Sequence, residues 1–571
     1  KFSEADIQRK KNGTLISSQD SDVTLVNKAK AEALIKKFST VEAVDAAYNE
    51  LRSMWDALLD KYVVKSDDEK LNRMVNIWSQ YQCMITFNFS RSASFFESGV
   101  GRGMGFRDSN QDLVGFVHQV PSRARERIID IASTQFPDGG CYHQYSPLTK
   151  KGNADIGGDF SDDPLWLILS VSAYIKESGD WSILDEMVPY DNDMSKAQTM
   201  LEHLKVSFYR IVNNLGPHGL PLAMRADWND CINLSCFSDT PGESFQTYTN
   251  PKFKAEGGYS KVAESVFVAA LFTFAGPNYV SILNHVGKKE EAAKAQAEID
   301  KMKKVMMESA WDGNWFIRAY DANGEKMGSK DCEESKIFIE PQGFAIMSDI
   351  DKDATEKTLK AIDENLNCEF GLVLNYPAFT KYHVQYGEIS TYPQGYKENG
   401  GIFTHNNAWI ICAAAYAGKG DQAFKYYSEI APSYTEETSD IHKTEPYVYG
   451  QMIGGKEAGS DIGNGGKNYG QGKNSWLTGT AAWNMVAISQ YILGIKPDFD
   501  GLMINPSIPS SWDGFKATRL FRGAKYNITI KNPNHVCKGV KSLVVDGKAI
   551  DGCVVPFVEG KKEVNVEITL G

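Results

Sequence analysis

The hydrophobic period changes once along the chain, and this change constrains the fold more than any other feature. From Thr40 apolar residues recur at three- and four-residue spacings, and segments of this kind continue for about 400 residues, which is typical of successive α-helices. After Pro497 the period becomes two, as at Tyr526 and Ile528, which is typical of half-buried strands. The sequence therefore predicts a mainly α-helical protein with a β tail.

Individual helices are predicted from apolar stripes and from residues that begin or end helices. The stripe of the first long helix consists of Val44, Ala47, Leu51, Met54, Leu58 and Tyr62. Pro164 occupies a first-turn position, Gly179 follows a helix end, and residues 262–275 are apolar nearly all round, as in a buried helix. Further helices are predicted near residues 67–78, 408–417 and 481–493.

Long loops rich in glycine, proline, aspartate and asparagine separate these helices. They cover residues 98–112, 137–163, 216–259, 384–407 and 454–476. Loops of this length are uncommon in compact domains unless they carry function. We therefore predict a helical toroid with a site built from loops at one rim.

The C-terminal tail is predicted to form a small antiparallel β-sandwich. Asp546-Gly547 and Asp551-Gly552 are typical hairpin signals, and the alternation of apolar residues resumes from Val564 to Leu570. A tail of roughly 70 residues is too small to be an independent enzyme.

Composition excludes several classes of function. A formal net charge of −12 argues against nucleic acid or an anionic membrane surface as the main partner. No apolar run approaches the roughly 18 residues of a membrane span, and no signal peptide is visible. The nine cysteines are scattered without a Cys-x-x-Cys pattern, which favours free thiols in a reducing compartment and no metal site. We expect a cytoplasmic protein.

The first segment of chemical interest runs from Arg102 through Arg107 and Asp108 to Asp112, with Arg91 upstream. Its glycines alone indicate only a flexible loop, and no strand precedes it as a dinucleotide-binding turn would require. Carboxylates and guanidinium groups alternate along it, and together such groups satisfy the paired hydroxyls of a polyol.

The second segment is Arg225-Ala-Asp-Trp-Asn-Asp230, on a loop between helices. One interpretation is a solvated acidic turn. The other is that Trp228 removes water from a neighbouring carboxyl group, Asp227 or Asp230, and thereby raises its pKa until it can donate a proton near neutral pH.

The third segment, residues 386–406, mixes aromatic side chains with Glu388, Lys397, Glu398 and His405. An isolated histidine is more often structural than functional. His405, however, lies just before a helix predicted to start near Ala408, where the helix dipole favours an anion.

The fourth segment is Thr478-Gly-Thr480, before the helix predicted from residue 481. Either threonine is a natural N-cap, and capping alone explains the pattern. The same hydroxyls and free N–H groups also suit a phosphate, and neither interpretation excludes the other.

With these segments the chain resembles the glycoside hydrolase family 94 disaccharide phosphorylases, most of all those that act on cellobiose. The resemblance covers nearly the whole chain. Its most specific pieces are Gly103-Met-Gly-Phe-Arg-Asp-Ser-Asn-Gln-Asp112, Ala226-Asp-Trp-Asn-Asp230 and Trp476-Leu-Thr-Gly-Thr480. Family members have an N-terminal β-sandwich, a helical linker, an (α/α)6 barrel and a C-terminal β-sandwich. We expect the N-terminal sandwich to be absent from this chain, which opens at the linker.

The resemblance implies three domains and a set of site residues. The domains are a linker with its helices over residues 1–65, an (α/α)6 catalytic barrel over 66–496 and the β-sandwich over 497–571. Asp230 is implied to be the general acid. The implied sugar-binding residues are Arg102, Asp108, Trp228, Glu388, Tyr392, Lys397, Glu398 and Gln451. The implied phosphate-binding residues are Arg91, His405, Thr478 and Gly479.

The implied reaction is the reversible, inverting phosphorolysis of cellobiose to α-glucose 1-phosphate and glucose. Asp230 would protonate the glycosidic oxygen while inorganic phosphate, a co-substrate, attacks from the opposite face. Phosphate is already anionic, so the second carboxylate that an inverting hydrolase needs to activate water is not required. The resemblance implies a homodimer that needs no cofactor and no metal.

Three alternatives remain open at this stage. The substrate of a phosphorylase could instead be a cellodextrin, chitobiose or laminaribiose. An inverting hydrolase could use Glu388 as the base that activates water, and activity without phosphate would favour it. A non-catalytic carbohydrate-binding protein would bind sugar tightly without turnover.

Overall fold

The computed structural model describes residues 29–91, 103–235, 237–242, 253, 258–459 and 468–571. The chain forms two compact units, Lys1–Leu59 and Asp60–Gly571. Within the described residues, the first unit consists of helices α2 (Ala29–Lys37) and α3 (Val41–Leu59). The long helix predicted from Thr40 is thus confirmed, but its predicted last residue, Tyr62, lies instead in strand β1. Pairing with a distant strand outweighs the local helical pattern there.

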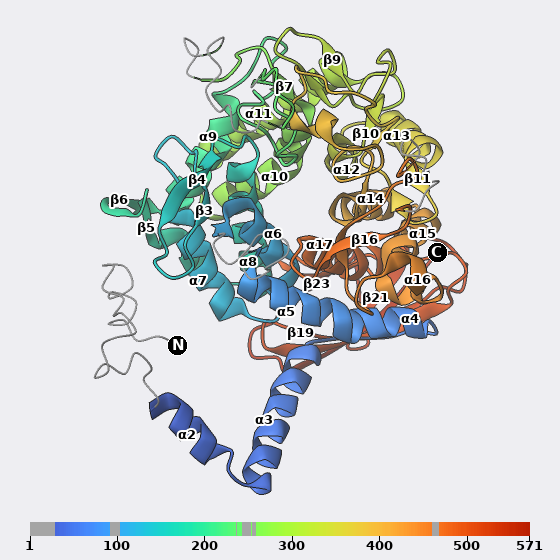
Figure 1. Cartoon of the computed structure of the whole chain (residues 1–571). Coiled ribbons are helices and arrows are strands. Elements are labelled where there is room, and N and C mark those ends of the chain that lie inside the picture. Colours follow the sequence, from blue (N-terminus) through green and yellow to red (C-terminus); the bar gives the residue numbers. More distant parts are fainter. Residues whose placement is uncertain (1–28, 92–102, 236, 243–252, 254–257, 460–467) are drawn as a thin grey trace. The chain divides into compact units, whose positions relative to one another are not determined.

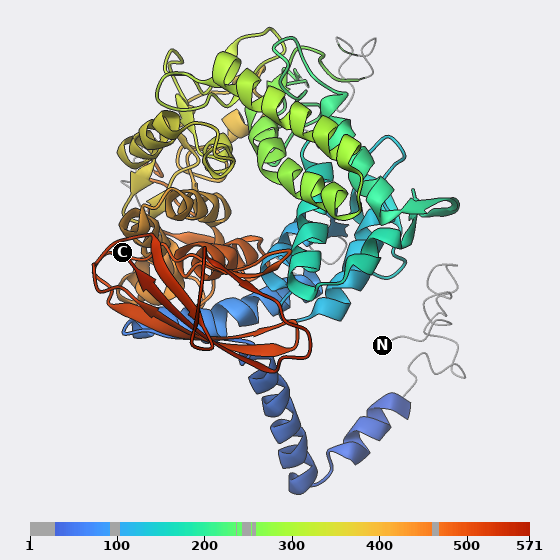
Figure 2. The ribbon, with the colours of Figure 1, turned by 180° about the vertical axis from the view of Figure 1, so that it is seen from behind.

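Six helices of the second unit contact one another in a closed cycle, which Figures 1 and 2 show from opposite sides. In order around the cycle they are α6 (Phe106–Phe116), α8 (Asp163–Ser178), α10 (Val266–His285), α12 (Glu340–Met347), α14 (Thr404–Tyr416) and α17 (Thr480–Val486). Most of their side chains are buried, because other elements cover them on the side away from the ring. Such helices are apolar nearly all round, as predicted for residues 262–275.

A second set of helices lies outside this ring and keeps one exposed face (Figures 1 and 2). These are α5 (Ser79–Phe89), α7 (Pro121–Ala132), α9 (Met200–Val212), α11 (Lys289–Val305), α13 (Lys352–Asn365) and α15 (Gly420–Ile430). Helices α7, α9, α11, α13 and α15 are amphipathic, which suits this position, whereas α5 is not amphipathic and most of its side chains are buried. The protein is therefore largely helical, and the closed cycle favours the predicted (α/α)6 barrel without establishing its details.

Short helical segments complete the helical part. They are α4 (Glu69–Arg73), α16 (Ser439–His442), the π-helical η1 (Met74–Trp78), η4 (Met306–Ala310) and η8 (Ala487–Ile492), and the 3-10 segments η2 (Trp181–Asp185), η5 (Glu388–Thr391), η6 (Pro432–Tyr434) and η7 (Glu436–Thr438). The helix predicted over 481–493 is thus α17 followed by η8. Gly179 ends α8 in the left-handed conformation, as predicted.

Helix α10 is longer than predicted and contains Pro277. It is long and apolar enough to cross a membrane by length and composition alone, and 72% of its apolar window is buried within the protein. Burial of this extent is typical of a core helix. The described cysteines are free thiols, as predicted.

Two sheets form most of the C-terminal part. The larger has the strand order β1 (Tyr62–Lys65), β19 (Gly514–Phe521), β20 (Ala524–Lys531), β24 (Glu563–Leu570), β21 (Val540–Val545) and β22 (Lys548–Ile550). The smaller has the order β17 (Ile495–Pro497), β18 (Gly501–Ile504) and β23 (Val554–Pro556). Tyr526, Ile528 and Ile530 are buried, as their alternation predicted. The sandwich and the three domain boundaries stay predictions.

Two predictions for this tail are wrong. The tail is not purely antiparallel, because the chain crosses to the smaller sheet at β23 and returns with β24 parallel to β20. For the same reason Asp551-Gly552 joins strands of different sheets and closes no hairpin. Asp546-Gly547 does close the β21–β22 hairpin, with positive φ angles of 48° and 79° that a two-residue type I′ turn requires.

Small sheets occupy the long loops between helices. Their strands are β2 (Met104–Gly105), β3 (Tyr142–Tyr145), β4 (Gly152–Gly158), β5 (Met187–Tyr190), β6 (Asp193–Thr199), β7 (Glu264–Ser265), β8 (Ala319–Tyr320), β9 (Lys326–Met327), β10 (Ile337–Phe338), β11 (Asn367–Cys368), β12 (Gly371–Leu372), β13 (Asn375–Tyr376), β14 (Ile402–Phe403), β15 (Gly450–Ile453) and β16 (Gly472–Ser475). The loop predicted over 98–112 is shorter than expected, since α6 begins at Phe106.

Aromatic side chains fill the centre of the helical ring. Phe344 on α12 contacts Trp166, Trp409 and Trp483, with ring centroids 6.0, 4.8 and 6.0 Å away. All four side chains are buried. These rings join helices α8, α12, α14 and α17, so the ring of helices depends on their packing.

Phe344→Ala is expected to lower the free energy of unfolding by about 3–5 kcal/mol, because it leaves a cavity among the three tryptophans. Denaturant titration followed by far-UV circular dichroism measures this change. Leu148→Ala is the control, since Leu148 is 83% exposed and its loss is expected to cost less than about 0.5 kcal/mol. Equal, small effects of both substitutions would contradict a central role for this cluster.

Candidate active site

The candidate site lies where the helices of the ring begin. Asp108 is in the first turn of α6, Asp162 directly precedes α8, Glu340 is the first residue of α12, His405 is in the first turn of α14, and Gly479 directly precedes α17. Helix N-termini carry partial positive charge and favour anions and carboxylates. The ring therefore gathers acidic side chains and anion-binding groups at one rim.

A pocket of about 210 Å³ opens at this rim. It is lined by Arg91, Arg107, Asp108, Trp228, Asn229, Asp230, Cys231, Tyr392, Lys397, Glu398, Phe403, His405, Gln451, Thr478 and Gly479. The structure thus brings together all the predicted site residues except two. Arg102 lies outside the described residues, and Glu388 adjoins the pocket through its hydrogen bond from the Tyr392 hydroxyl, 2.7 Å long.

The buried guanidinium of Arg107 holds Asp230, whereas the sequence predicted only that the guanidinium groups of this segment could bind a polyol. Its Nη1 donates to Asp230 Oδ1 at 2.7 Å, and its Nε and Nη2 each donate to Asp162 at 2.8 Å. Burial opposes the charged form, but the carboxylates of Asp162 and Asp230 raise the pKa of Arg107 well above its usual value. Arg107 therefore stays charged and fixes one oxygen of Asp230. Its position beside Asp108 was the available signal in the sequence.

Of the two carboxylates that flank Trp228, only Asp230 faces the pocket. Asp227 is buried against Arg318, which donates two hydrogen bonds of 2.7 Å to it, and it also accepts one from Ser265. Although burial opposes the carboxylate, these partners hold the pKa of Asp227 below its usual value. Asp227 thus anchors the loop, while the Asp230 side chain is 36% exposed.

The indole of Trp228 packs against aromatic rings of helix α14. Its ring packs edge-on against His405 and Trp409, with centroids 5.3 and 5.2 Å away. The carboxylate of Asp230 accepts a hydrogen bond from the Arg107 guanidinium. Trp228 therefore forms a wall between the acid loop and helix α14.

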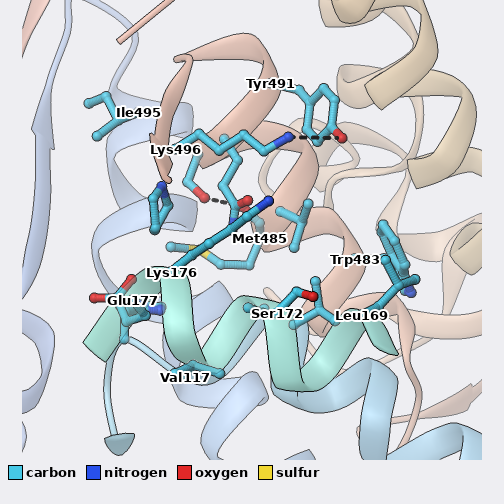
Figure 3. A pocket seen from close by; sticks show the side chains of 18 of the residues that line it. Val117, Leu169, Ser172, Lys176, Glu177, Trp483, Met485, Tyr491, Ile495 and Lys496 are labelled. Atoms are coloured by element: carbon cyan, nitrogen blue, oxygen red, sulfur yellow. Dashed lines mark hydrogen bonds between the residues drawn. The ribbon is translucent and has the colours of Figure 1, made fainter. Parts of the chain in front are cut away.

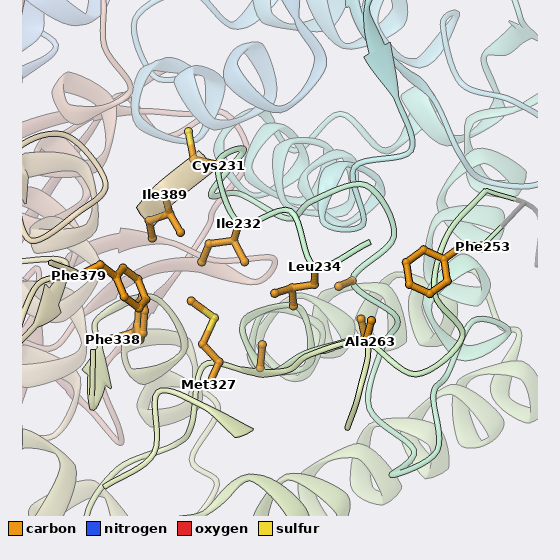
Figure 4. Close-up of a cluster of buried hydrophobic side chains, with 12 residues drawn as sticks. Cys231, Ile232, Leu234, Phe253, Ala263, Met327, Phe338, Phe379 and Ile389 are labelled. Carbon is orange, nitrogen blue, oxygen red and sulfur yellow. The ribbon is translucent and has the colours of Figure 1, made fainter. Parts of the chain in front are cut away.

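The loop that carries Asp230 is fixed to the segment around Glu388. Asn233 donates to the carbonyl of Asp230 at 2.8 Å and accepts from the Glu388 N–H at 3.2 Å. Below these bonds a cluster of buried apolar side chains joins the two segments, with Ile232 and Ile389 next to each other in Figure 4. The acid is therefore held by long-range packing and not by its own loop alone.

In another part of the pocket wall, His405, Arg91 and Gly479 converge. His405 Nε2 lies 2.8 Å from Gln111 Oε1, which also accepts from the Trp483 indole at 2.8 Å. We therefore assign the proton to Nε2, which leaves Nδ1 as an acceptor. Burial and the charge of Arg91 lower the pKa of His405 to about 3, so the ring is neutral.

Gly479 allows this close approach. A Cβ at residue 479 would lie 2.4 Å from His405 Cε1 and 3.1 Å from Arg91 Nη2. Arg91 is itself oriented by Asp112, which accepts hydrogen bonds of 2.9 and 3.2 Å from it. A side chain at residue 479 would therefore displace the imidazole and the guanidinium.

Two local predictions at this wall need correction. Gly479, not Thr478 or Thr480, is the N-cap of α17, and the Thr478 hydroxyl accepts from the Thr480 N–H at 3.2 Å instead. Helix α14 begins at Thr404, so His405 lies inside its first turn and not before it. The helix begins before its apolar stretch because its first residues are buried within the ring.

Charged and aromatic groups form the remaining wall. The Lys397 ammonium lies 4.7 Å from the Tyr392 ring centroid, and Gln451 accepts from Asn474 at 3.0 Å. Burial raises the pKa of Glu398 to about 7, and its Oε2 is buried without a hydrogen-bond partner. Such a carboxyl group can donate a hydrogen bond to a hydroxyl. Within the described ranges, no three histidine, cysteine or acidic side chains are grouped to hold a metal ion.

Glu398→Gln is expected to change how stability depends on pH. The folded-state pKa of Glu398 is raised from 4.5 to about 7, so the folded state holds the proton more tightly than the unfolded chain. The wild type should therefore lose about 1–3 kcal/mol relative to Glu398→Gln as pH rises from 4.5 to 7. Unfolding titrations across this range measure the difference, with exposed Glu445→Gln as control. A constant difference between the two proteins would contradict the raised pKa.

Comparisons with known proteins agree with this geometry. The model of the Glycosyl hydrolase 94 superfamily, catalytic domain, matches residues 54–494. N,N′-diacetylchitobiose phosphorylases of Vibrio proteolyticus and Vibrio furnissii are each 32% identical, over 96% and 92% of this chain and 67% and 64% of their own length. Solabiose phosphorylase of Paenibacillus borealis is 30% identical over 92% of this chain and 63% of its own. The chain thus spans about two thirds of the length of these relatives.

Among solved structures, a GH78 family rhamnosidase of Bacillus sp. GL1 superposes with a TM-score of 0.52 and 11% identity, over 89% of this chain and 44% of that chain. At this identity the likeness concerns the fold alone. The family match covers most of the residues that build the ring and all the described residues that line the pocket. The chain therefore belongs to the glycosyl hydrolase 94 superfamily.

Proposed function

We propose that this protein is an inverting phosphorylase of β-linked disaccharides, built on an (α/α)6 barrel. The observation that carries the proposal is the pairing of groups in one pocket. Asp230 faces it from one wall, and Arg91, His405 and Gly479 converge on another. One acid and one anion site are what phosphorolysis requires, because the phosphate is itself the nucleophile.

Asp230 is proposed to protonate the glycosidic oxygen. Arg107 holds its Oδ1, which leaves Oδ2 to carry the proton. When the proton leaves, the adjacent guanidinium stabilises the carboxylate that forms. A fixed charge of this kind needs no reorganisation during the reaction.

Phosphate is proposed to bind between Arg91, His405 and Gly479. The Arg91 fork suits phosphate oxygens. The neutral His405 presents Nδ1 as an acceptor, which matches the O–H of a phosphate monoanion. Because residue 479 is a glycine, the space beside the imidazole stays open to the ligand. A Cβ at this position would contact the imidazole. Attack from this wall on a sugar protonated by Asp230 inverts the anomeric carbon and yields an α-sugar 1-phosphate.

The rival interpretation as a hydrolase has less support. It requires Glu388 as the base that activates water, but Glu388 does not line the described pocket, and its Oε1 accepts from Tyr392. The sugar shell is proposed to consist of Asp108, Trp228, Glu388, Tyr392, Lys397, Glu398 and Gln451, with Arg102. The homodimer, the cytoplasmic location and the absence of a cofactor stay predictions.

Asp230→Asn is expected to lower the turnover number for phosphorolysis by about 10²- to 10⁴-fold, because it keeps the shape of the acid but removes its proton. The assay follows phosphate-dependent release of sugar 1-phosphate by the full-length protein. Near-normal turnover on an unactivated disaccharide would contradict the assignment of the acid.

Arg91→Ala is expected to raise the dissociation constant for phosphate roughly tenfold or more, through the loss of a charge-assisted contact. The affinity for disaccharide should change less. Titration calorimetry with each ligand compares the two effects, and equal weakening of both would rule out a dedicated phosphate role.

The most specific part of the proposal is the identity of the preferred disaccharide. The resemblance seen in the sequence favoured cellobiose, but the relatives named above give cellobiose no specific support, and two of them are named for N,N′-diacetylchitobiose. We therefore expect kcat/KM for N,N′-diacetylchitobiose to exceed that for cellobiose, laminaribiose and cellotetraose. A higher value for cellobiose would reverse this order and leave the phosphorylase assignment intact.

A further inference from the structure

A second cavity lies where the helical ring meets the C-terminal sheets. It has a volume of about 130 Å³ and is lined by residues of α6, α8, α10, α17, η8, β17 and β19 (Figure 3). It shares no lining residue with the candidate active site. This volume is slightly below the roughly 150 Å³ of a cavity that binds benzene, so the cavity suits a ligand with about one small ring.

Two lysines of this cavity have no acidic partner. Lys176 of α8 donates to the Asn278 amide oxygen at 2.8 Å, and Lys496 of β17 donates to the Tyr491 hydroxyl at 3.4 Å. Neither amine forms an ion pair within the part of the chain that the structure describes. Both lysine side chains are partly buried, and a partly buried charge that forms no ion pair is stabilised by a bound anion.

The other charges of the cavity do not neutralise these lysines. Glu177 is paired with Arg519 at 2.5 Å, so its carboxylate is already occupied. Burial and the nearby Lys496 lower the pKa of Lys176 to about 8, and burial lowers that of Lys496, although Asp498 acts against both shifts. Among the lysine and arginine side chains that line the cavity, only Arg519 thus forms an ion pair within the described residues.

The remaining wall is mostly apolar. Leu169, Trp483 and Met485 line the cavity together with Ser172, and in Figure 3 the Lys496 amine points toward the Tyr491 hydroxyl. Apolar walls suit a ring or short hydrocarbon body, and the two ammonium groups suit one oxyanion. The lysine part of the wall thus suits the charged head of such a ligand, and the apolar part suits its body.

We propose that this cavity binds a small organic anion, with a carboxylate or phosphate head between Lys176 and Lys496 and an apolar body against Trp483 and Met485. The head could belong to either of two classes of metabolite, and the probes below distinguish them. The site does not depend on the proposed phosphorylase activity.

Titration calorimetry on the full chain tests the proposal with three probes that share a phenyl ring. Benzoate carries a carboxylate, phenyl phosphate carries a phosphate, and benzyl alcohol carries no charge. At least one of the two anions is expected to bind saturably with a stoichiometry of one, and at least tenfold more tightly than benzyl alcohol. Binding should persist in Arg91→Ala, which separates this cavity from the proposed phosphate site.

Lys176→Met and Lys496→Met are each expected to weaken anion binding at least tenfold, because methionine keeps the apolar stem but removes the charge. Lys516→Met, an exposed lysine on β19, is the control and should bind as the wild type does. Circular dichroism checks that each variant is folded. Lack of saturable binding of both anions by the wild type, or equal affinity in the lysine variants, would overturn the proposal. The comparison of the two anions with benzyl alcohol uses the wild-type protein, so it does not depend on whether a variant folds.

Discussion

The buried guanidinium of Arg107 joins three parts of the chain that are far apart in sequence. It comes from the first turn of α6, binds Asp162 at the start of α8, and donates to Asp230 and to the carbonyl of Asp227. Removal of one partner of such a buried ion pair typically costs about 3–5 kcal/mol, because a charge is left uncompensated. The position of the acid is therefore a property of the closed ring of helices.

The same ring explains why Asp230 shares one pocket with Arg91, His405 and Gly479. Its helices begin at a common rim, so their N-termini and first-turn side chains point toward the same space. Packing within the ring also sets the protonation state of His405. Its imidazole is buried, hydrogen-bonded to Gln111 and neutral. Helix α17 contributes Gly479 to this pocket and Trp483 to the second cavity.

Hydrophobic periodicity predicted the helices and the β tail, because side-chain burial follows that period directly. It failed where distant pairing decides the outcome. Tyr62 continues a helical stripe but pairs with β19, and β24 lies parallel to β20. The sequence motifs also named most of the residues that the structure brings together at the pocket. They could not reveal that Arg107 holds Asp230, or that Asp227 is buried against Arg318, since both contacts form only when separate loops meet.

The central claim is that phosphate, and not water, attacks the sugar. The most direct test uses phosphate labelled with ¹⁸O at every oxygen, in unlabelled water, with ³¹P NMR of the product formed from N,N′-diacetylchitobiose or cellobiose. The account predicts an α-sugar 1-phosphate that retains every labelled oxygen, including the one that bridges phosphorus and the anomeric carbon. Release of free sugar with a water oxygen at that carbon, without labelled sugar phosphate, would contradict it.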